Sequence, residues 1–183
     1  MREFEIIPVH IRWMIRRDMP EVLDIESHSF EFPWSAEDFK RCLCQRNSIG
    51  LVAEHDEQVV GFTIYELHKT RLHLLNLAVS PECQRRGVGM SIMARMLRKL
   101  SHDRRNRILL EVRESNLSAQ QFFRSCGMRA VSVLPGFYDD TDEDAYLMQF
   151  DINEDFAKFP AEVIANSDPE RPTDPTPIKG VAG

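Results

Sequence analysis

One carboxylate stands where it could remove a proton from a substrate. Glu111 lies in the apolar run RILLEVRE, five residues before Asn116, which precedes the short segment LSAQQFF. In a strand, Glu111 and Arg113 would share one face, so they could equally form an exposed ion pair that adds little stability. Asn116 also has a structural explanation as the N-cap of a helix. On these residues alone, a surface glutamate is a better interpretation of Glu111 than a catalytic base.

A glycine loop in SPECQRRGVGMSIMARML could bind phosphate. Gly87 and Gly89 would let backbone N–H groups approach a ligand, and the N-terminus of a helix predicted over Val88–Leu100 adds free donors and partial positive charge. Arg85 and Arg86 add two full charges. The loop lacks the G-K-[ST] of a Walker motif and the third glycine of a Rossmann motif. A lone G-x-G is more often an ordinary loop, so other motifs must support this interpretation.

Strand and helix signals alternate along most of the chain. They predict strands at 11–15, 48–55, 58–67, 71–80, 107–114, 128–138 and 145–152, and helices at 18–28, 36–45, 88–100 and 116–125. Asp18 and Ser35 are the expected helix starts, and Gly127 suits a left-handed helix end. We therefore expect one α/β domain over residues 1–153. A disordered tail is expected over 154–183, where four prolines lie in NSDPERPTDPTPIKGVAG.

Composition narrows the class of protein. The net charge of −6 argues weakly against nucleic acid and anionic membranes as partners, although the stretch from Arg85 to Arg107 is locally basic. No apolar run reaches the ~20 residues of a membrane span, and we expect neither a signal peptide nor membrane binding. We therefore expect a cytoplasmic protein.

We also expect no metal site. The cysteines lack zinc-type spacing, and we interpret His68 and His73 as hydrogen-bonded sheet residues rather than a catalytic pair.

Five motifs occur in an order that resembles the GCN5-related N-acetyltransferase (GNAT) family, and more closely its ribosomal-protein-alanine N-acetyltransferase branch. They are SFEFPWS (29–35), LNLAV (75–79), QRRGVG (84–89), LEVRESN (110–116) and GFYDDTDEDAYLM (136–148). The likeness covers about residues 10 to 150. It implies a mixed, mostly antiparallel sheet flanked by helices and splayed between its fourth and fifth strands. Acetyl-CoA would lie in the cleft.

The resemblance also implies roles for particular residues. Leu77, Ala78 and Val79 would offer backbone groups to the pantetheine arm, and Asn116 would contact the same arm. Glu111 would be the proton acceptor. The residues that would wrap the pyrophosphate are Arg85, Arg86, Gly87, Val88, Gly89 and Met90.

The acceptor side and the proton donor each have two alternative assignments. Phe32 and Trp34 fall where the family binds the acceptor, but core aromatics are an equal alternative. The branch carries a proton-donating tyrosine where this chain has Phe123, which cannot donate. Tyr138, expected to line the acceptor site, is another candidate donor. The acids after it could form a rim for a basic peptide or a solvated loop; they are Asp139, Asp140, Asp142, Glu143 and Asp144.

We expect acetyl transfer to an amine, and the N-terminal α-amine of a protein such as a ribosomal protein fits best. A glutamate of ordinary pKa about 4.3 is a poor base for a lysine at about 10.4, whereas an α-amine at about 7.7–8.0 is partly neutral at cellular pH. A small amine or a lysine remains an alternative acceptor. A different alternative is a protein that binds acyl-CoA without turnover. Phe123 favours it, and Glu111 argues against it.

Overall fold

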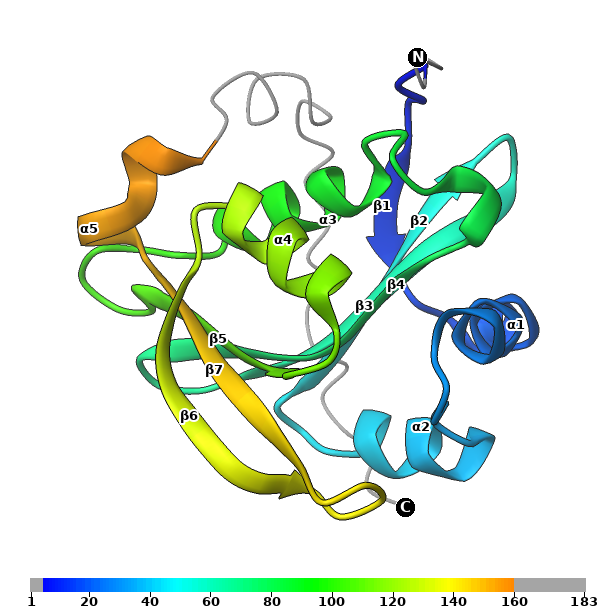
Figure 1. The fold of residues 1–183 in the computed structure, drawn as a ribbon. Coiled ribbons are helices and arrows are strands. Elements are labelled where there is room, and N and C mark those ends of the chain that lie inside the picture. The colour runs from blue at the N-terminus through cyan, green and yellow to red at the C-terminus, as the bar shows by residue number, and fades with distance from the viewer. Residues whose placement is uncertain (1–4, 160–183) are drawn as a thin grey trace, which may run out of the picture.

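The computed structural model describes residues 5–159 and is built on a seven-stranded sheet (Figure 1). The strand order is β1-β2-β3-β4-β5-β7-β6, with one parallel pair, β4–β5, among antiparallel neighbours. The strands are β1 His10–Trp13, β2 Ser48–His55, β3 Gln58–Leu67, β4 Arg71–Val79, β5 Arg107–Arg113, β6 Arg129–Tyr138 and β7 Glu143–Asp151. The helices are α1 Met19–Ser29, α2 Ala36–Leu43, α3 Val88–Leu97, α4 Leu117–Ser125 and α5 Ile152–Asp155. The predicted fold class and element order are confirmed.

Local sequence signals explain several element ends. Ser35 and Asp38 form a capping box at the start of α2, because the Ser35 hydroxyl accepts the N–H of Asp38 at 3.2 Å and the Asp38 carboxylate accepts the N–H of Ser35 at 2.9 Å. Asp18 precedes α1 as predicted, but its carboxylate accepts the N–H of Ile15 at 2.8 Å and pairs with Arg12 instead of capping the helix. Gly127 has φ of 79°, the left-handed conformation expected after α4.

Strands β4 and β5 pair only where they begin. Their ladder contains three residue pairs and ends at His73 opposite Leu109. Beyond it β4 continues beside β3 as far as Val79, while β5 continues beside β7, so the two strands diverge (Figure 1). This is the predicted splay between the fourth and fifth strands.

The sheet is covered on two faces. Leu51 and Val52 on β2 point to opposite sides: Leu51 packs in the cluster of α3 and α4, and Val52 in the cluster of α1 and α2. On β5, Leu110 is buried in the cluster of α3 and α4, so Glu111 and Arg113 face the α1 and α2 side. The alternation on β5 therefore decides which face carries the predicted base.

The packed region extends to Phe159, beyond the predicted boundary at residue 153. Helix α5 is followed by a single 3₁₀ turn at Phe156–Lys158, and the side chain of Phe159 is buried in the core. Residues 160–183, most of the predicted disordered tail, lie outside the described residues. Within residues 5–159, no helix has the length and apolar character needed to cross a membrane.

Candidate active site

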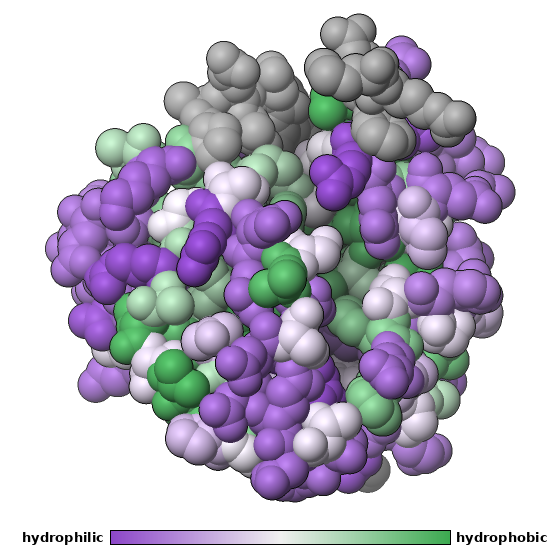
Figure 2. Space-filling model, in the orientation of Figure 1, coloured by the Kyte–Doolittle hydropathy of each residue, from purple (hydrophilic) through white to green (hydrophobic). Residues whose placement is uncertain are grey.

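A cavity of about 1600 Å³ lies on the α3 and α4 face, beside the diverging strands. Figure 2 shows this side of the molecule, where hydrophobic surface lies in a hollow between hydrophilic residues. The lining contains every predicted cofactor-binding residue except Arg86: Leu77, Ala78, Val79, Arg85, Gly87, Val88, Gly89, Met90 and Asn116. Phe122 and Phe123 of α4 form part of the wall. Glu111 is not on it.

One wall of the cavity is the edge of β4 beyond the point where β5 diverges from it. Leu77, Ala78 and Val79 pair with β3 on one side, at Thr63, Phe62 and Gly61 respectively, and line the cavity. A strand edge presents N–H and C=O groups that an extended amide-containing ligand can join as an added strand. This edge therefore suits a chain with amide groups, such as pantetheine.

The loop before α3 and the first turn of this helix line the cavity. Arg85 and Gly87 have φ of 60° and 84°, a left-handed conformation that turns the chain sharply into the helix. The Gly87 carbonyl accepts the N–H of Ser91 at 3.0 Å, so the N–H groups at the first helical positions have no acceptor within α3. Arg85 lines the cavity, whereas the Nε of Arg86 donates to the Glu5 carbonyl at 3.2 Å. Helix N-terminus and Arg85 together suit an anion.

Gly89 has a packing role that the sequence pattern did not indicate. A Cβ atom on Gly89 would lie 3.0 Å from Cζ of Phe122. Helices α3 and α4 therefore approach each other more closely than a larger residue at position 89 would allow. Of the two loop glycines, Gly87 supplies the turn and Gly89 the close approach of the helices.

Glu111 contacts a histidine across the start of the splay. Its Oε2 lies 2.7 Å from Nε2 of His73, and their side chains are 18% and 24% exposed. The contact forms because His73 is paired with Leu109, which precedes Glu111 by two residues on the same face of β5. His73 is thus a hydrogen-bonded sheet residue, as predicted, with Glu111 as its partner. Glu111 also does not form the alternative pair with Arg113.

Arg113 joins two separate segments beside Glu111. Its guanidinium carbon lies 3.8 Å from the centre of the Tyr138 ring and 5.1 Å from that of Phe32. Its Nη1 donates to Asp140 at 3.0 Å and to Glu143 at 3.3 Å. The bonds from Arg113 hold the pKa of Asp140 below its usual range. Arg113 thus ties the Phe32 loop and the β6–β7 turn to β5.

The acids after Tyr138 are largely bonded within the fold. Asp140 and Glu143 bond to Arg113, Glu143 also accepts the N–H of Ser115 at 2.7 Å, and Asp144 accepts the N–H of Gly136 at 2.8 Å. Asp140, Glu143 and Asp144 therefore help to hold the turn in place.

Tyr138 can act as a hydrogen donor at neutral pH, and Phe123 cannot. Burial raises the pKa of Tyr138 to about 12; Arg113 opposes this shift and Glu111 adds to it, so the phenol stays protonated. Phe123 is 8% exposed and packs in the core cluster at the cavity wall. Tyr138 is thus a hydroxyl donor that lies within electrostatic reach of Glu111.

The two predicted acceptor aromatics have different surroundings. Phe32 is 45% exposed, whereas Trp34 packs edge-on against Phe39 with ring centres 5.4 Å apart. The backbone N–H of Trp34 donates to Glu26 at 2.7 Å, and the other Glu26 oxygen accepts the Asn76 side chain at 3.0 Å. Burial raises the pKa of Glu26. Glu26, which the sequence did not indicate, ties the loop from α1 to α2 to strand β4.

The cofactor-type cavity and the candidate base lie on opposite faces of the sheet. The cavity opens on the α3 and α4 face, and Glu111 points to the α1 and α2 face. Past His73 and Leu109, β4 and β5 no longer form a ladder. A ligand on the β4 edge and an amine on the Glu111 side could therefore meet in the gap between these strands.

Comparisons with known proteins agree with this geometry. The profile of the acetyltransferase (GNAT) family matches residues 19–128. The chain is 28% identical over 138 residues to the ribosomal protein bS18-alanine N-acetyltransferase of Escherichia coli, covering 74% of this chain and 93% of that protein. It is 32% identical over 139 residues to an N-acetyltransferase of Methanocaldococcus jannaschii, covering 75% and 88%.

The fold gives the same result. The crystal structure of the ribosomal-protein-S18-alanine N-acetyltransferase from Escherichia coli superimposes with a TM-score of 0.71 at 26% identity, covering 79% of this chain and 94% of that one. The resemblance inferred from the five motifs is confirmed. The chain belongs to the acetyltransferase (GNAT) family and is an acetyl-CoA-dependent N-acetyltransferase.

Proposed function

We propose that this chain acetylates the N-terminal α-amine of a protein, with Glu111 as the base. One observation carries the proposal: Glu111 stands where β4 and β5 separate, on the face opposite the cavity, with His73 bonded to it at 2.7 Å. A base in this position can reach an amine that enters from the α1 and α2 side. The relatives from Escherichia coli are named for acetylating the alanine of ribosomal protein bS18, which makes a ribosomal protein N-terminus the first acceptor to test.

Acetyl-CoA fits the cavity residues chemically. Leu77 to Val79 would pair with the pantetheine amides, and Arg85 with the N–H groups at the start of α3 would hold the pyrophosphate. The Oδ1 of Asn116 already accepts the N–H of Ala119 at 3.0 Å, so its contact with the cofactor arm would come from the Nδ2 hydrogens. Arg86, bonded to Glu5, would contribute charge from outside the cavity wall.

The residues divide the transfer into two proton movements. The amine nitrogen forms a bond to the acetyl carbon while the carbon–sulfur bond breaks, and the proton lost by nitrogen goes to Glu111. The departing thiolate takes a proton from Tyr138 or from water. The phenol of Tyr138 is protonated at neutral pH, and its raised pKa makes it a weaker acid than an ordinary tyrosine. His73 would position the Glu111 carboxylate through its Nε2.

The acceptor surface would be the side of β5 near Phe32. Phe32 is exposed and, with Tyr138, flanks Arg113 next to Glu111. We propose that the first residues of the acceptor lie against Phe32 and Tyr138, while Trp34 supports the loop from within.

We propose that the protein works in the cytoplasm. Its thiols include an exposed one at Cys44 and half-buried ones at Cys42 and Cys83, and free thiols are typical of a reducing compartment.

The test uses peptides that differ only at the amine. The protein is mixed with acetyl-CoA and peptides beginning with alanine that contain an internal lysine, with the α-amine free or blocked, and the acetyl group is located by mass spectrometry. We expect acetylation of the free α-amine only. Acetylation confined to lysine would contradict the proposal, and transfer to small amines alone would assign the acceptor to another class.

A further inference from the structure

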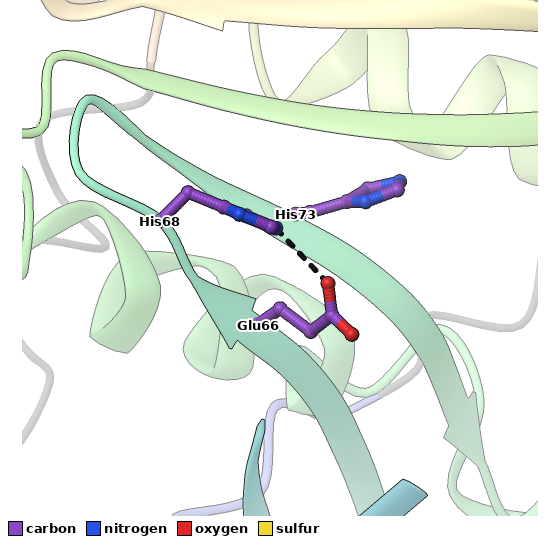
Figure 3. A group of neighbouring side chains, drawn as sticks. All are labelled: Glu66, His68 and His73. Atoms are coloured by element: carbon purple, nitrogen blue, oxygen red, sulfur yellow. Dashed lines mark hydrogen bonds and ion pairs between the residues drawn. The ribbon is translucent and has the colours of Figure 1, made fainter. Parts of the chain in front are cut away.

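Three metal-ligating side chains meet on the β3–β4 hairpin, away from the cavity (Figure 3). Glu66 and His73 are directly opposite each other in the β3–β4 ladder, so their side chains share a face. His68 follows Glu66 by two residues, and its N–H donates to the Arg71 carbonyl at 2.9 Å, which closes the tight turn. One ligand atom from each of the three residues lies within 4.8 Å of the others.

The set of donors matches a transition metal better than a hard cation. Two imidazoles and one carboxylate are the ligands of many three-residue zinc sites, in which water takes the fourth position, whereas Mg²⁺ and Ca²⁺ prefer oxygen. With zinc bonds of about 2.0–2.1 Å, tetrahedral ligand atoms stand about 3.3 Å apart. The Glu66 and His68 atoms already lie 2.9 Å apart, as the dashed line in Figure 3 shows, so His73 has the larger adjustment to make.

The cluster is open to solvent, which allows both entry and adjustment. The side chains of Glu66, His68 and His73 are 25%, 31% and 24% exposed. A histidine–glutamate hydrogen bond on a sheet surface needs no metal to explain it. The third residue is what distinguishes this site, because His73 brings a second imidazole to the same face while its Nε2 contacts Glu111.

We propose that Glu66, His68 and His73 bind a divalent transition metal, with Zn²⁺ as the probe, and that the bound ion competes with Glu111 for Nε2 of His73. When the metal holds Nε2, the Glu111 carboxylate loses the donor that positions it, so zinc inhibits the transfer. The binding half of the proposal is independent of the proposed function, and the inhibition half rests on it.

Binding is tested without turnover. Zinc affinity of the full chain is measured by calorimetry for the unchanged protein, His68→Asn, Glu66→Gln and the matched control His28→Asn, whose histidine is exposed on α1 away from the cluster. We expect each cluster variant to bind at least tenfold more weakly and the control to bind as the unchanged protein does. The Co²⁺ absorption spectrum should show nitrogen and oxygen ligands without a thiolate band. Equal affinities in all four proteins, or a thiolate spectrum, would overturn the site.

Inhibition is tested in the peptide assay by mass spectrometry, because zinc would bind the CoA thiol in a thiol-release assay. Each rate is divided by the zinc-free rate of the same variant. For the unchanged protein and His28→Asn, we expect saturating zinc to lower the relative acetylation rate at least tenfold. His68→Asn should need at least tenfold more zinc for the same loss of rate. If turnover is unaltered with zinc bound, the proposed effect of the metal on Glu111 is overturned, although the metal site itself stands. If the protein transfers no acetyl group even without zinc, that result counts against the proposed function. The calorimetric test of zinc binding does not depend on that function.

Discussion

Nε2 of His73 lies 2.7 Å from Oε2 of Glu111, at the point where β4 and β5 cease to run side by side. The contact joins the strand whose free edge lines the cavity to the strand that carries the candidate base. A small shift of β4 against β5 would therefore move the candidate base as well as the strand edge that lines the cavity. The position of this pair underlies the first two predictions.

Glu111→Gln should lower kcat by about 10²–10⁴-fold, because the amide keeps the shape of the side chain but cannot accept the amine proton. The Kd for acetyl-CoA should stay within about twofold, since Glu111 does not line the cavity. Both constants are measured by peptide kinetics and calorimetry. Glu114→Gln, an exposed acid at the end of the same strand, is the matched control and should behave as the unchanged protein.

His73→Ala should lower kcat roughly tenfold with little change in the KM for acetyl-CoA, because the Glu111 carboxylate loses the donor that positions it. His73→Gln keeps a side-chain N–H and should recover part of the loss. Steady-state kinetics of both variants separate kcat from KM. Equal losses in the two variants, or a rise in KM alone, would mean that His73 acts only through packing.

Tyr138→Phe should lower kcat severalfold while leaving the fold intact, because the ring remains stacked on Arg113 and only the hydroxyl is lost. In the unchanged protein the pKa of Tyr138 is about 12, raised by burial against the opposing charge of Arg113, with Glu111, Glu143 and Asp140 adding to the rise.

The stability contributed by Tyr138 should therefore be complete below pH about 10, the ordinary pKa of tyrosine, and be lost as the pH rises through about 12. Thermal unfolding of the unchanged protein and of Tyr138→Phe over this range measures it. The variant should show the weaker dependence above pH 10. An unchanged kcat in the variant would remove Tyr138 as the donor to the thiolate.

Phe123→Tyr tests whether protonation of the thiolate limits the reaction. Phe123 lines the cavity, so a hydroxyl at its Cζ could point into it, and kcat should rise severalfold. Phe122→Tyr is the control, because the Cζ of Phe122 faces Gly89 and its extra oxygen should disturb the packing of α3 on α4. A lower melting temperature with no gain in kcat for Phe123→Tyr would show that the wall has no room for the oxygen.

Glu26→Ala should destabilise the protein by about 1–3 kcal/mol, because the N–H of Trp34 and the side chain of Asn76 both lose their acceptor. The KM for the peptide should also rise, since the loop bearing Phe32 is no longer tied to β4, while the KM for acetyl-CoA should stay the same. Denaturant unfolding and peptide kinetics measure the two effects. Glu31→Ala, in the same loop but exposed, should change neither stability nor KM.

Features set by neighbouring residues could be predicted from the sequence. Asp56 and Glu57, between the predicted strands 48–55 and 58–67, form a hairpin turn with positive φ at both residues, and the Ser35 box starts α2. The loop at Gly87 and the N-cap Asn116 also lie as predicted, because each is determined by bonds within a few residues. The predicted cofactor-binding residues could be named in the same way, since most of them follow one another along the chain.

Contacts between distant segments required the tertiary structure. His73 meets Glu111 across 38 residues, and Glu26 meets Asn76 across 50. Such pairs depend on the register of the strands, and a shift of one residue turns every side chain to the other face. A register shift between Ile64 and Tyr65 in the ladder of β3 with β4 lies in the same hairpin as the proposed metal site.

By itself the sequence determined the family and the order of the elements, and it named most of the segment that lines the cavity, because these are written in local patterns. Only the tertiary structure decided that Glu111 bonds to His73 rather than Arg113, that Trp34 packs inward while Phe32 is exposed, and that two histidines and Glu66 share one face. The physical reason is that these contacts depend on how strands far apart in sequence are aligned, which no local pattern records.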